Sequence, residues 1–225
     1  MRRLASVLTV TAALLLPGSP ARAAPDRLID QLRGIHDAGQ VIAVTTSGYG
    51  TSYATFRAYR HTAHGWQRVF GPWSARIGYN GFAPRGGKRE GDGRTPTGSY
   101  HFQFMFGVDG NPGVRFHFRR ALQTSYWDDD SSSANYNRWV DSRYDATGQN
   151  PERMHVSPAY NYGAVIGYNT SRTPGRGSAI FLHVSHGSAT AGCVSIGQER
   201  LVKVLRWLRP GRHPRIIMGT HNAVT

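Results

Sequence analysis

The stretch from Gln40 to Trp73 constrains the fold more than any other, because its apolar and polar residues alternate through three successive runs. Ser47-Gly48 and residues 62–65 separate these runs, and both are turn-forming sequences. Alternation with a period of two is typical of strands that bury one face. A meander of such strands forms an antiparallel sheet with one polar face. The sequence therefore predicts β-structure as the basis of the fold.

The rest of the chain adds further strands to this meander. A glycine-rich loop that includes residues 91–98 leads into a predicted strand from Ser99 to Phe106. Residues 109–160 hold few continuous apolar runs and predict an irregular, aromatic-rich excursion that lies over the sheet. The expected fold class is mainly β, a β-rich α+β domain. Three apolar runs predict buried strands: residues 164–169, 178–184 and 214–219.

Two segments have apolar residues at helical spacing. Residues 26–39 predict a short helix that stops near Gly39, with an apolar face formed by Leu28, Ile29, Leu32 and Ile35. Ser195 followed by Gln198 has the spacing of a capping box, so Ser195 is the predicted N-cap of a second helix. Pro210-Gly211 ends that helix, and its apolar face consists of Leu201, Val204, Leu205 and Leu208.

The N-terminus has the pattern of an export signal. Arg2-Arg3 precede an apolar run from Leu4 to Leu16, and Ala21-Arg22-Ala23 follows as a cleavage sequence. We therefore expect residues 1–23 to be a signal peptide, with a retained signal anchor as the alternative. No later segment resembles a transmembrane helix. The predicted location of the mature chain is extracytoplasmic, either secreted or associated with the cell wall.

The charge of the chain indicates its class of partner. The formal net charge is +14, and removal of Arg2, Arg3 and Arg22 leaves +11. A cationic exported protein is expected to associate with anionic polymers outside the membrane, such as cell-wall carboxylates and phosphates. Nucleic acid is the rival partner for such a charge. The arginines are scattered, without a basic helix or zinc-finger spacing, so no nucleic-acid partner is expected.

Cys193 is the one cysteine in the sequence, so the chain forms no internal disulfide. An odd cysteine in an exported protein either dimerises or is reactive. Its place two residues before the predicted N-cap puts it close to the positive end of a helix, which favours a thiolate. A small buried hydrophobic residue is the structural alternative.

His183 ends an apolar run ten residues before Cys193. If that strand lies beside the segment that carries Cys193, the two side chains meet, and a thiol beside an imidazole is typical of acyl transfer. Small residues before the cysteine, among them Gly192, leave backbone N–H groups free to form an oxyanion hole. His186 could orient this pair, bind substrate or face water.

Two metal hypotheses compete with this interpretation. His183, His186 and Cys193 could bind zinc, although their spacing on a non-helical segment is a weak signal. The run Asp128–Asp130 could bind a cation, but a solvated turn with side-chain to backbone hydrogen bonds is the preferred interpretation. We therefore expect no metal and no cofactor.

Four blocks, taken in order, resemble one known family. Residues 177–196, GSAIFLHVSHGSATAGCVSI, resemble the catalytic core of the L,D-transpeptidase catalytic-domain family, the YkuD-like group. The sequences GDGRTPTGSYHFQFMFG, AVIGYNT and WDDDSSSANYNRWV are also similar to segments of an exported branch of that family. The resemblance covers residues 38–219. It implies a single catalytic domain there, a β-sandwich or barrel with a helix after the catalytic cysteine, preceded by a helical segment at 24–37.

The resemblance also implies residue roles. Cys193 matches the family's nucleophile and His183 its general base, with the N–H groups of Gly192 and Cys193 at the oxyanion. Thr190 and Gly192 fit the motif before the cysteine. Ala191 replaces a histidine and Ser195 replaces an arginine that would approach a substrate carboxylate. Loop position makes three further residues possible substrate contacts or structural residues: Arg94, Tyr168 and Asn169.

The implied function is that of a peptidoglycan L,D-transpeptidase. Such an enzyme forms a thioester with a stem tetrapeptide during cell-wall cross-linking or remodelling, which affects cell shape. Three alternatives remain from the residues alone. The chain could be an L,D-carboxypeptidase, a metal-dependent cell-wall hydrolase, or a non-catalytic cationic protein that binds the wall.

Overall fold

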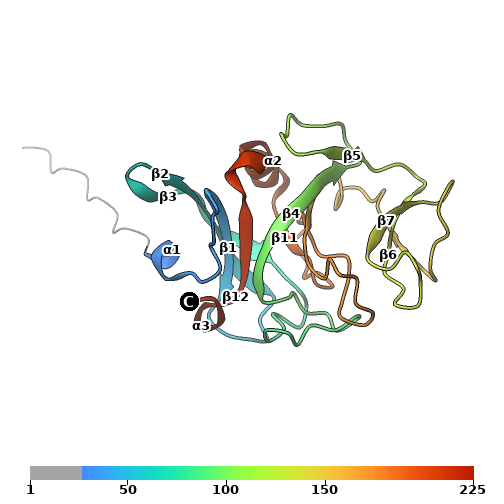
Figure 1. The fold of residues 1–225 in the computed structure, drawn as a ribbon, viewed down its shortest axis with the longest axis horizontal. Helices are drawn as coiled ribbons and strands as arrows, with labels where there is room; N and C mark the ends of the chain where they lie inside the picture. The colour runs from blue at the N-terminus through green and yellow to red at the C-terminus, as the bar shows by residue number, and fades with distance from the viewer. Residues whose placement is uncertain (1–26) are drawn as a thin grey trace, which may run out of the picture.

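A computed structural model describes residues 27–225, so the predicted signal peptide lies outside the described residues. The main feature is a closed barrel of eight strands, in the order β12-β1-β2-β3-β11-β10-β9-β4, in which β4 pairs again with β12 (Figure 1). The strands are β1 (Gln40–Thr46), β2 (Tyr53–Thr62), β3 (Gly65–Arg76), β4 (Gly98–Gly107), β9 (Gly163–Ile166), β10 (Phe181–Val184), β11 (Val194–Ile196) and β12 (Arg215–Thr220).

The predicted meander is confirmed, because β1, β2 and β3 pair antiparallel in sequence order. The barrel as a whole is mixed, since β1 runs parallel to β12 and β10 runs parallel to β11. The expectation of one polar face is wrong for β1, which is buried along its whole length. Val41 and Ala43 face a second apolar cluster outside the barrel, whereas Ile42 and Val44 face the interior.

The predicted N-terminal helix is shorter than expected, and its apolar residues belong to that outer cluster. α1 (Leu28–Gln31) is one turn long and ends well before Gly39. Gly34 then takes a φ of +77°, and a Cβ there would lie 2.8 Å from Cβ of Ser99, so the chain turns where a helix cannot continue. The predicted apolar residues still pack on the outer face of β1, together with Val224 of α3 (His221–Val224), a helix that the sequence pattern did not indicate.

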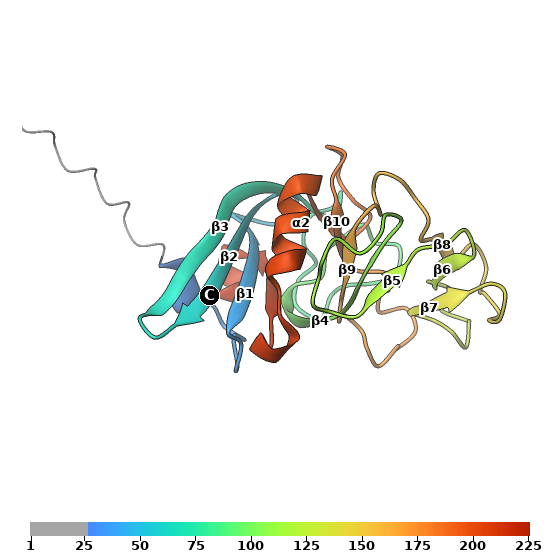
Figure 2. The same ribbon diagram turned by 90° about the horizontal axis from the view of Figure 1, so that it is seen from above.

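The helix after the cysteine is confirmed as α2 (Gln198–Trp207), which lies across one end of the barrel (Figures 1 and 2). Its four predicted apolar residues are buried in the barrel core. The predicted capping box is wrong. Gly197 is the N-cap and no side chain caps the helix, because Ser195 lies in β11, buried and paired with His183 and Arg76. A short 3₁₀ turn, η1 (Pro210–Arg212), follows α2.

The segment predicted as irregular holds a second, three-stranded sheet, at the opposite end of the molecule from α1 (Figure 2). Its order is β7-β6-β8, formed by β6 (Ser125–Asp128), β7 (Arg138–Asp141) and β8 (Glu152–Arg153), while β5 (Phe118–Arg120) pairs with β4. These strands are too short to show a clear alternation. Trp127 of β6 stacks edge-on against Phe181 of the barrel, with ring centroids 5.0 Å apart, so the small sheet packs on the outside of β10.

Asp128 ends β6 and anchors the loops of this small sheet. Its carboxylate accepts hydrogen bonds from the hydroxyl of Ser133 at 2.6 Å and from the backbone N–H groups of Gly148 and Asp130 at 2.9 and 3.1 Å. The predicted turn bonding is present, but Asp128 is fully buried rather than solvated. Within residues 27–225 no group of three or more potential metal ligands was found, and no helix there is long and apolar enough to cross a membrane.

Candidate active site

The parallel pairing of β10 with β11 brings His183 and Cys193 onto one face. Leu182 lies opposite Val194 and both point into the barrel core. Since side chains alternate along a strand, Phe181 and His183 point outward, as does Cys193 directly before β11. The backbone N–H of Phe181 donates to Sγ of Cys193 at 3.3 Å. The strand that carries His183 therefore lies beside the cysteine, as the sequence required for an acyl-transfer pair.

Both side chains line a cleft of about 480 Å³ between the barrel and the small sheet. The barrel side of the cleft consists of β10, the start of β11 and the loop that joins them, which contributes His186, Thr190, Ala191 and Gly192. Three carboxyl groups also line the cleft, those of Glu90, Asp129 and Glu152, together with the cations Lys88 and Arg153. An acidic cleft is unexpected in a chain with a net charge of +14.

The thiol of Cys193 is held in the protonated form. Cys193 is 8% exposed and packs in a cluster with Phe106, Trp127 and Phe181. Burial raises the pKa of the thiol well above its usual range, and the charge of Glu152 raises it further, against the Phe181 N–H and Lys88. Sγ donates to the carbonyl of Ala179 at 3.2 Å. The predicted helix-end stabilisation of a thiolate is wrong, because β11 separates Cys193 from α2.

His183 is neutral, which makes it able to accept a proton. The ring is 6% exposed, and burial lowers its pKa to about 4, against the carbonyls of Val184 and Ala159. Nδ1 lies 3.0 Å from the carbonyl oxygen of Val184. A carbonyl accepts only, so Nδ1 carries the proton and Nε2 carries the lone pair. The ring of Tyr160 meets the imidazole edge-on, with centroids 5.4 Å apart, and limits its rotation.

Two threonines hold the backbone of the cysteine. Oγ1 of Thr190 donates to the carbonyl of Cys193 at 2.7 Å, and Oγ1 of Thr95 reaches the same oxygen at 3.3 Å. The Thr95 hydroxyl also accepts the N–H of Gly78, which ties the glycine-rich loop to the barrel. The N–H of Gly192 donates to Oγ1 of Thr190 at 3.2 Å. The Gly192 N–H, one of the two predicted oxyanion donors, is therefore already hydrogen-bonded, and the role of the Cys193 N–H stays a prediction.

Comparison with known proteins matches most of this chain to one family. Residues 57–217 match the family described as YkuD, the L,D-transpeptidase catalytic domain. The chain belongs to the L,D-transpeptidase catalytic domain family. No curated protein matches the chain. The fold resembles the crystal structure of the helical cell shape determining protein Pgp2 from Campylobacter jejuni, at 14% identity and a TM-score of 0.40. The match covers 81% of this chain and 48% of Pgp2, so the chain spans about half that length.

The structure brings some of the predicted site residues of this L,D-transpeptidase domain together and separates others. His186, Thr190 and Gly192 line the cleft with Cys193 and His183. Arg94 turns away from it, and its guanidinium donates to the carbonyl of Phe82 at 3.3 Å. Two more predicted contacts, Tyr168 and Asn169, line a neighbouring hollow.

Thr190→Val is expected to lower the free energy of unfolding by about 1–2 kcal/mol. Valine keeps the volume of threonine but removes the hydroxyl that bonds both the Cys193 carbonyl and the Gly192 N–H. The same change should slow acylation of Cys193, because its backbone is no longer fixed. Urea unfolding and the rate of acyl-enzyme formation measure the two effects. Thr190→Ser keeps the hydroxyl and should restore both quantities; equal losses in both variants would contradict this role.

Glu152 and Tyr160 are site residues that the sequence did not indicate. Glu152 follows Pro151 in the segment without apolar periodicity, so nothing local signals that its carboxyl faces a cleft. The hydroxyl of Tyr160 donates to Glu152, and burial together with the charges of Asp129 and Glu90 raises the pKa of Glu152 to about 7. The hydroxyls of Ser178 and Tyr136 similarly donate to Oε2 of Glu90. The acidic wall of the cleft is therefore hydrogen-bonded and fixed.

Glu152→Gln is expected to change how stability depends on pH. The folded pKa of Glu152 is about 7 against an ordinary 4.5, so the native state binds the extra proton and stability falls as pH rises through this window. Glutamine removes this loss, worth about 3 kcal/mol at pH 8. The stability of the variant should therefore fall less steeply than that of wild type between about pH 4.5 and 7.

Urea unfolding at several pH values between 4 and 8 measures this slope. Glu199→Gln, an exposed carboxyl on α2, is the matched control and should leave the wild-type slope in place. Identical pH profiles for Glu152→Gln and wild type would show that the Glu152 carboxyl ionises normally.

Proposed function

We propose that this chain is a cysteine L,D-transpeptidase that acts on the stem tetrapeptides of peptidoglycan. The observation that carries the proposal is the placement of Cys193 and His183 on paired strands with both side chains in one cleft. Membership of the family supports the reaction class. The volume of about 480 Å³ is that of a pocket for a short peptide segment rather than for a whole polymer.

In the first step, Nε2 of His183 takes the thiol proton while Sγ of Cys193 attacks the carbonyl carbon of the L-configured centre of the diamino acid. The C–N bond to the terminal D-residue breaks, and His183 delivers the proton to the departing amine. A thioester remains on Cys193. A thiol that starts protonated and an imidazole that starts neutral are the pair that this step requires.

The backbone N–H of Cys193 donates to the oxygen that becomes negative in the tetrahedral intermediate. In the second step, the amine of a neighbouring stem attacks the thioester and His183 accepts its proton, which returns to Sγ as the thiol leaves. The product is a cross-link between two stems. Water in place of the amine gives an L,D-carboxypeptidase, which is the same chemistry with a different acceptor.

The setting of this reaction follows from the rest of the chain. We place the enzyme outside the cytoplasmic membrane, exported by residues 1–23 and held at the wall by anionic polymers that match its positive charge. The catalytic domain then comprises residues 38–219, and residues 24–37 lead into it. Wall cross-linking or remodelling, with an effect on cell shape, is the proposed process.

Intact-protein mass spectrometry after exposure to a carbapenem tests the nucleophile. We expect an adduct of one drug molecule on wild type and none on Cys193→Ala, because the β-lactam carbonyl acylates the thiol. Purified disaccharide tetrapeptide should in parallel be converted to cross-linked dimers. Absence of both the adduct and any tetrapeptide turnover would overturn the proposal.

The same protein samples separate the alternative functions. A metal-dependent hydrolase would lose activity in a chelator, whereas the thiol enzyme keeps it. A non-catalytic wall-binding protein would bind sacculi equally well as wild type and as Cys193→Ala, with no tetrapeptide turnover in either.

A further inference from the structure

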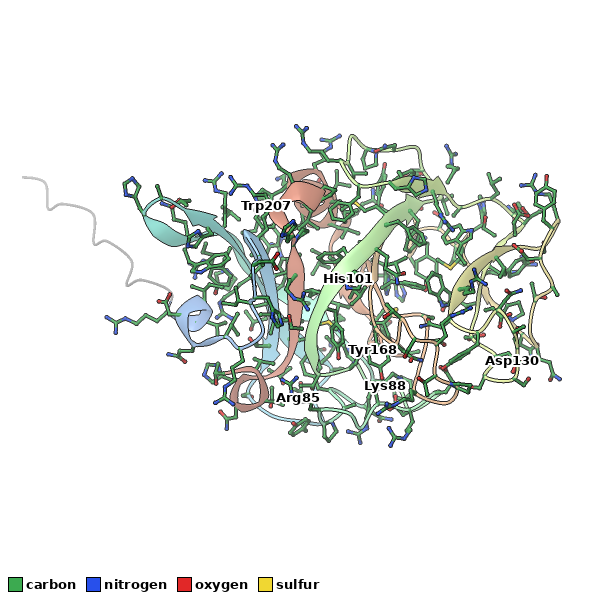
Figure 3. All side chains as sticks on the ribbon, in the orientation of Figure 1. Arg85, Lys88, His101, Asp130, Tyr168 and Trp207 are labelled. Carbon is green, nitrogen blue, oxygen red and sulfur yellow. The ribbon has the colours of Figure 1, made fainter. Side chains whose placement is uncertain are left out.

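A second hollow, of about 310 Å³, opens beside the active-site cleft. It lies between the loop at residues 84–88, the start of β4 and the loop at residues 168–176. We call it the arginine hollow, after Arg85 and Arg176, which line it together with Lys88. Figure 3 shows Arg85, Lys88 and Tyr168 near one another at the lower side of the molecule, whereas Asp130 lies far from them on the small sheet.

The charge of the arginine hollow is positive. Among the described residues that line it there is no carboxylate. The ammonium of Lys88 is buried and pairs with Asp92 at 2.6 Å, which offsets its charge. Arg85 and Arg176 are exposed, and a guanidinium N–H of Arg85 donates to the carbonyl of Ala223 at 3.3 Å. Their guanidinium groups therefore keep donors for a ligand.

The walls of the hollow are rigid. The rings of Tyr100 and Tyr168 meet edge-on with centroids 5.6 Å apart. Their hydroxyls donate to the backbone carbonyls of Thr97 at 2.9 Å and of Arg176 at 2.6 Å. The Asn169 side chain likewise bonds within its own loop. Because these polar groups are already hydrogen-bonded to the backbone, the guanidinium groups of Arg85 and Arg176 are the donors that can bind a ligand.

Lys88 lines both cavities, so the two cavities are neighbours that share this side chain. The two cavities differ in charge. The active-site cleft presents Glu90, Asp129 and Glu152 against the one guanidinium of Arg153. Burial first, and then the charges of the neighbouring carboxylates, raise the pKa values of Asp129 and Glu152. A carboxylate is repelled there and attracted beyond Lys88.

We propose that the arginine hollow is an anion subsite, which binds a carboxylate of the peptide whose scissile carbonyl lies at Cys193. Guanidinium groups bind carboxylates through paired N–H donors, so Arg85 and Arg176 fix the anionic end of the ligand. The carboxylates of the active-site cleft repel that anionic end, so the peptide lies with its carboxylate in the arginine hollow. The choice of peptide rests on the proposed function, whereas the anion site itself does not.

Calorimetric binding to Cys193→Ala protein tests the subsite without turnover. The probes are a disaccharide tetrapeptide with free carboxylates and the same compound with its carboxylates amidated. Amidation should weaken binding by about tenfold or more, the fold-change of one charged hydrogen bond. Arg85→Gln with Arg176→Gln should weaken the free carboxylate form by a similar factor and leave the amidated form unchanged.

Arg60→Gln with Arg115→Gln is the matched control, because it removes the same charge from exposed positions away from both cavities. Equal binding of the free carboxylate peptide by both double variants would overturn the subsite. Carbapenem labelling of Arg85→Gln with Arg176→Gln keeps the two proposals apart. If this double variant loses the preference for the carboxylate peptide but is labelled normally, its defect lies in the subsite alone. If wild type is not labelled, the proposed thiol chemistry is contradicted and the subsite is not.

Discussion

His183→Asn is expected to slow acylation of Cys193 by about 10²- to 10⁴-fold, the range over which a positioned general base contributes. The reason lies in the pKa of each partner. Burial and the Glu152 charge keep the thiol protonated at neutral pH, so no standing population of thiolate can act without a base. Asparagine retains a polar side chain of similar reach but cannot take the proton. The neutral thiol is then left as the attacking group.

His186→Asn is the matched control, since His186 lines the same cleft but lies beyond the end of β10. Its rate of carbapenem adduct formation should stay within a few-fold of wild type. The acid limb of the wild-type profile should fall near pH 4, because the lowered pKa of His183 keeps the imidazole neutral down to that value. An equal loss of rate in both variants would contradict the role of His183 as the base, and an acid limb near pH 6.5 would contradict its lowered pKa.

Phe181→Ala is expected to destabilise the fold by about 3–5 kcal/mol, the usual result of emptying a buried aromatic position. Phe181 has no exposed surface, and its ring meets those of Phe106, Trp127 and Tyr160 at 5.0–5.8 Å. The loss approaches the whole stability of many domains, which is about 5–15 kcal/mol. The cavity would open beneath Cys193, so acylation should fall as well.

Tyr144→Ala removes an aromatic ring of similar size that is 81% exposed, and should change the unfolding free energy by less than about 0.5 kcal/mol. Chemical denaturation monitored by tryptophan fluorescence measures both variants. Phe181→Leu fills part of the cavity and should recover part of the loss. A change below about 1 kcal/mol for Phe181→Ala would mean that the small sheet closes over the gap.

The sequence predicted those elements whose pattern is local. The run that forms β2 alternates because one face of the strand packs on the core, and α2 shows its buried stripe directly. The closure of the barrel has no local pattern in the sequence. It depends on pairing between β4 and β12, which places Tyr100 opposite Ile216, far along the chain. The capping box failed because Ser195 satisfies a spacing rule while tertiary pairing places it in a strand.

Part of the site could be predicted from the sequence and part could not. The juxtaposition of His183 with Cys193 could be anticipated because both lie next to apolar runs that become neighbouring strands. The positions of Glu90 and Glu152 in the cleft could not be anticipated, because both residues come from segments without apolar periodicity. The burial of such residues depends on tertiary contacts. Likewise, the raised pKa of the thiol depends first on its burial and then on a carboxyl group 41 positions earlier in the sequence.

The two sides of the active-site cleft have separate origins in the chain. Cys193 and His183 belong to the barrel, whereas Asp129 and Glu152 belong to the small sheet, which occupies one continuous insertion between β5 and β9. Under the proposed function, reactivity and peptide selectivity are therefore carried by separate segments of the chain. Exchange of the small-sheet segment for that of a relative is then a way to change the peptide preference while the barrel and its cysteine stay the same.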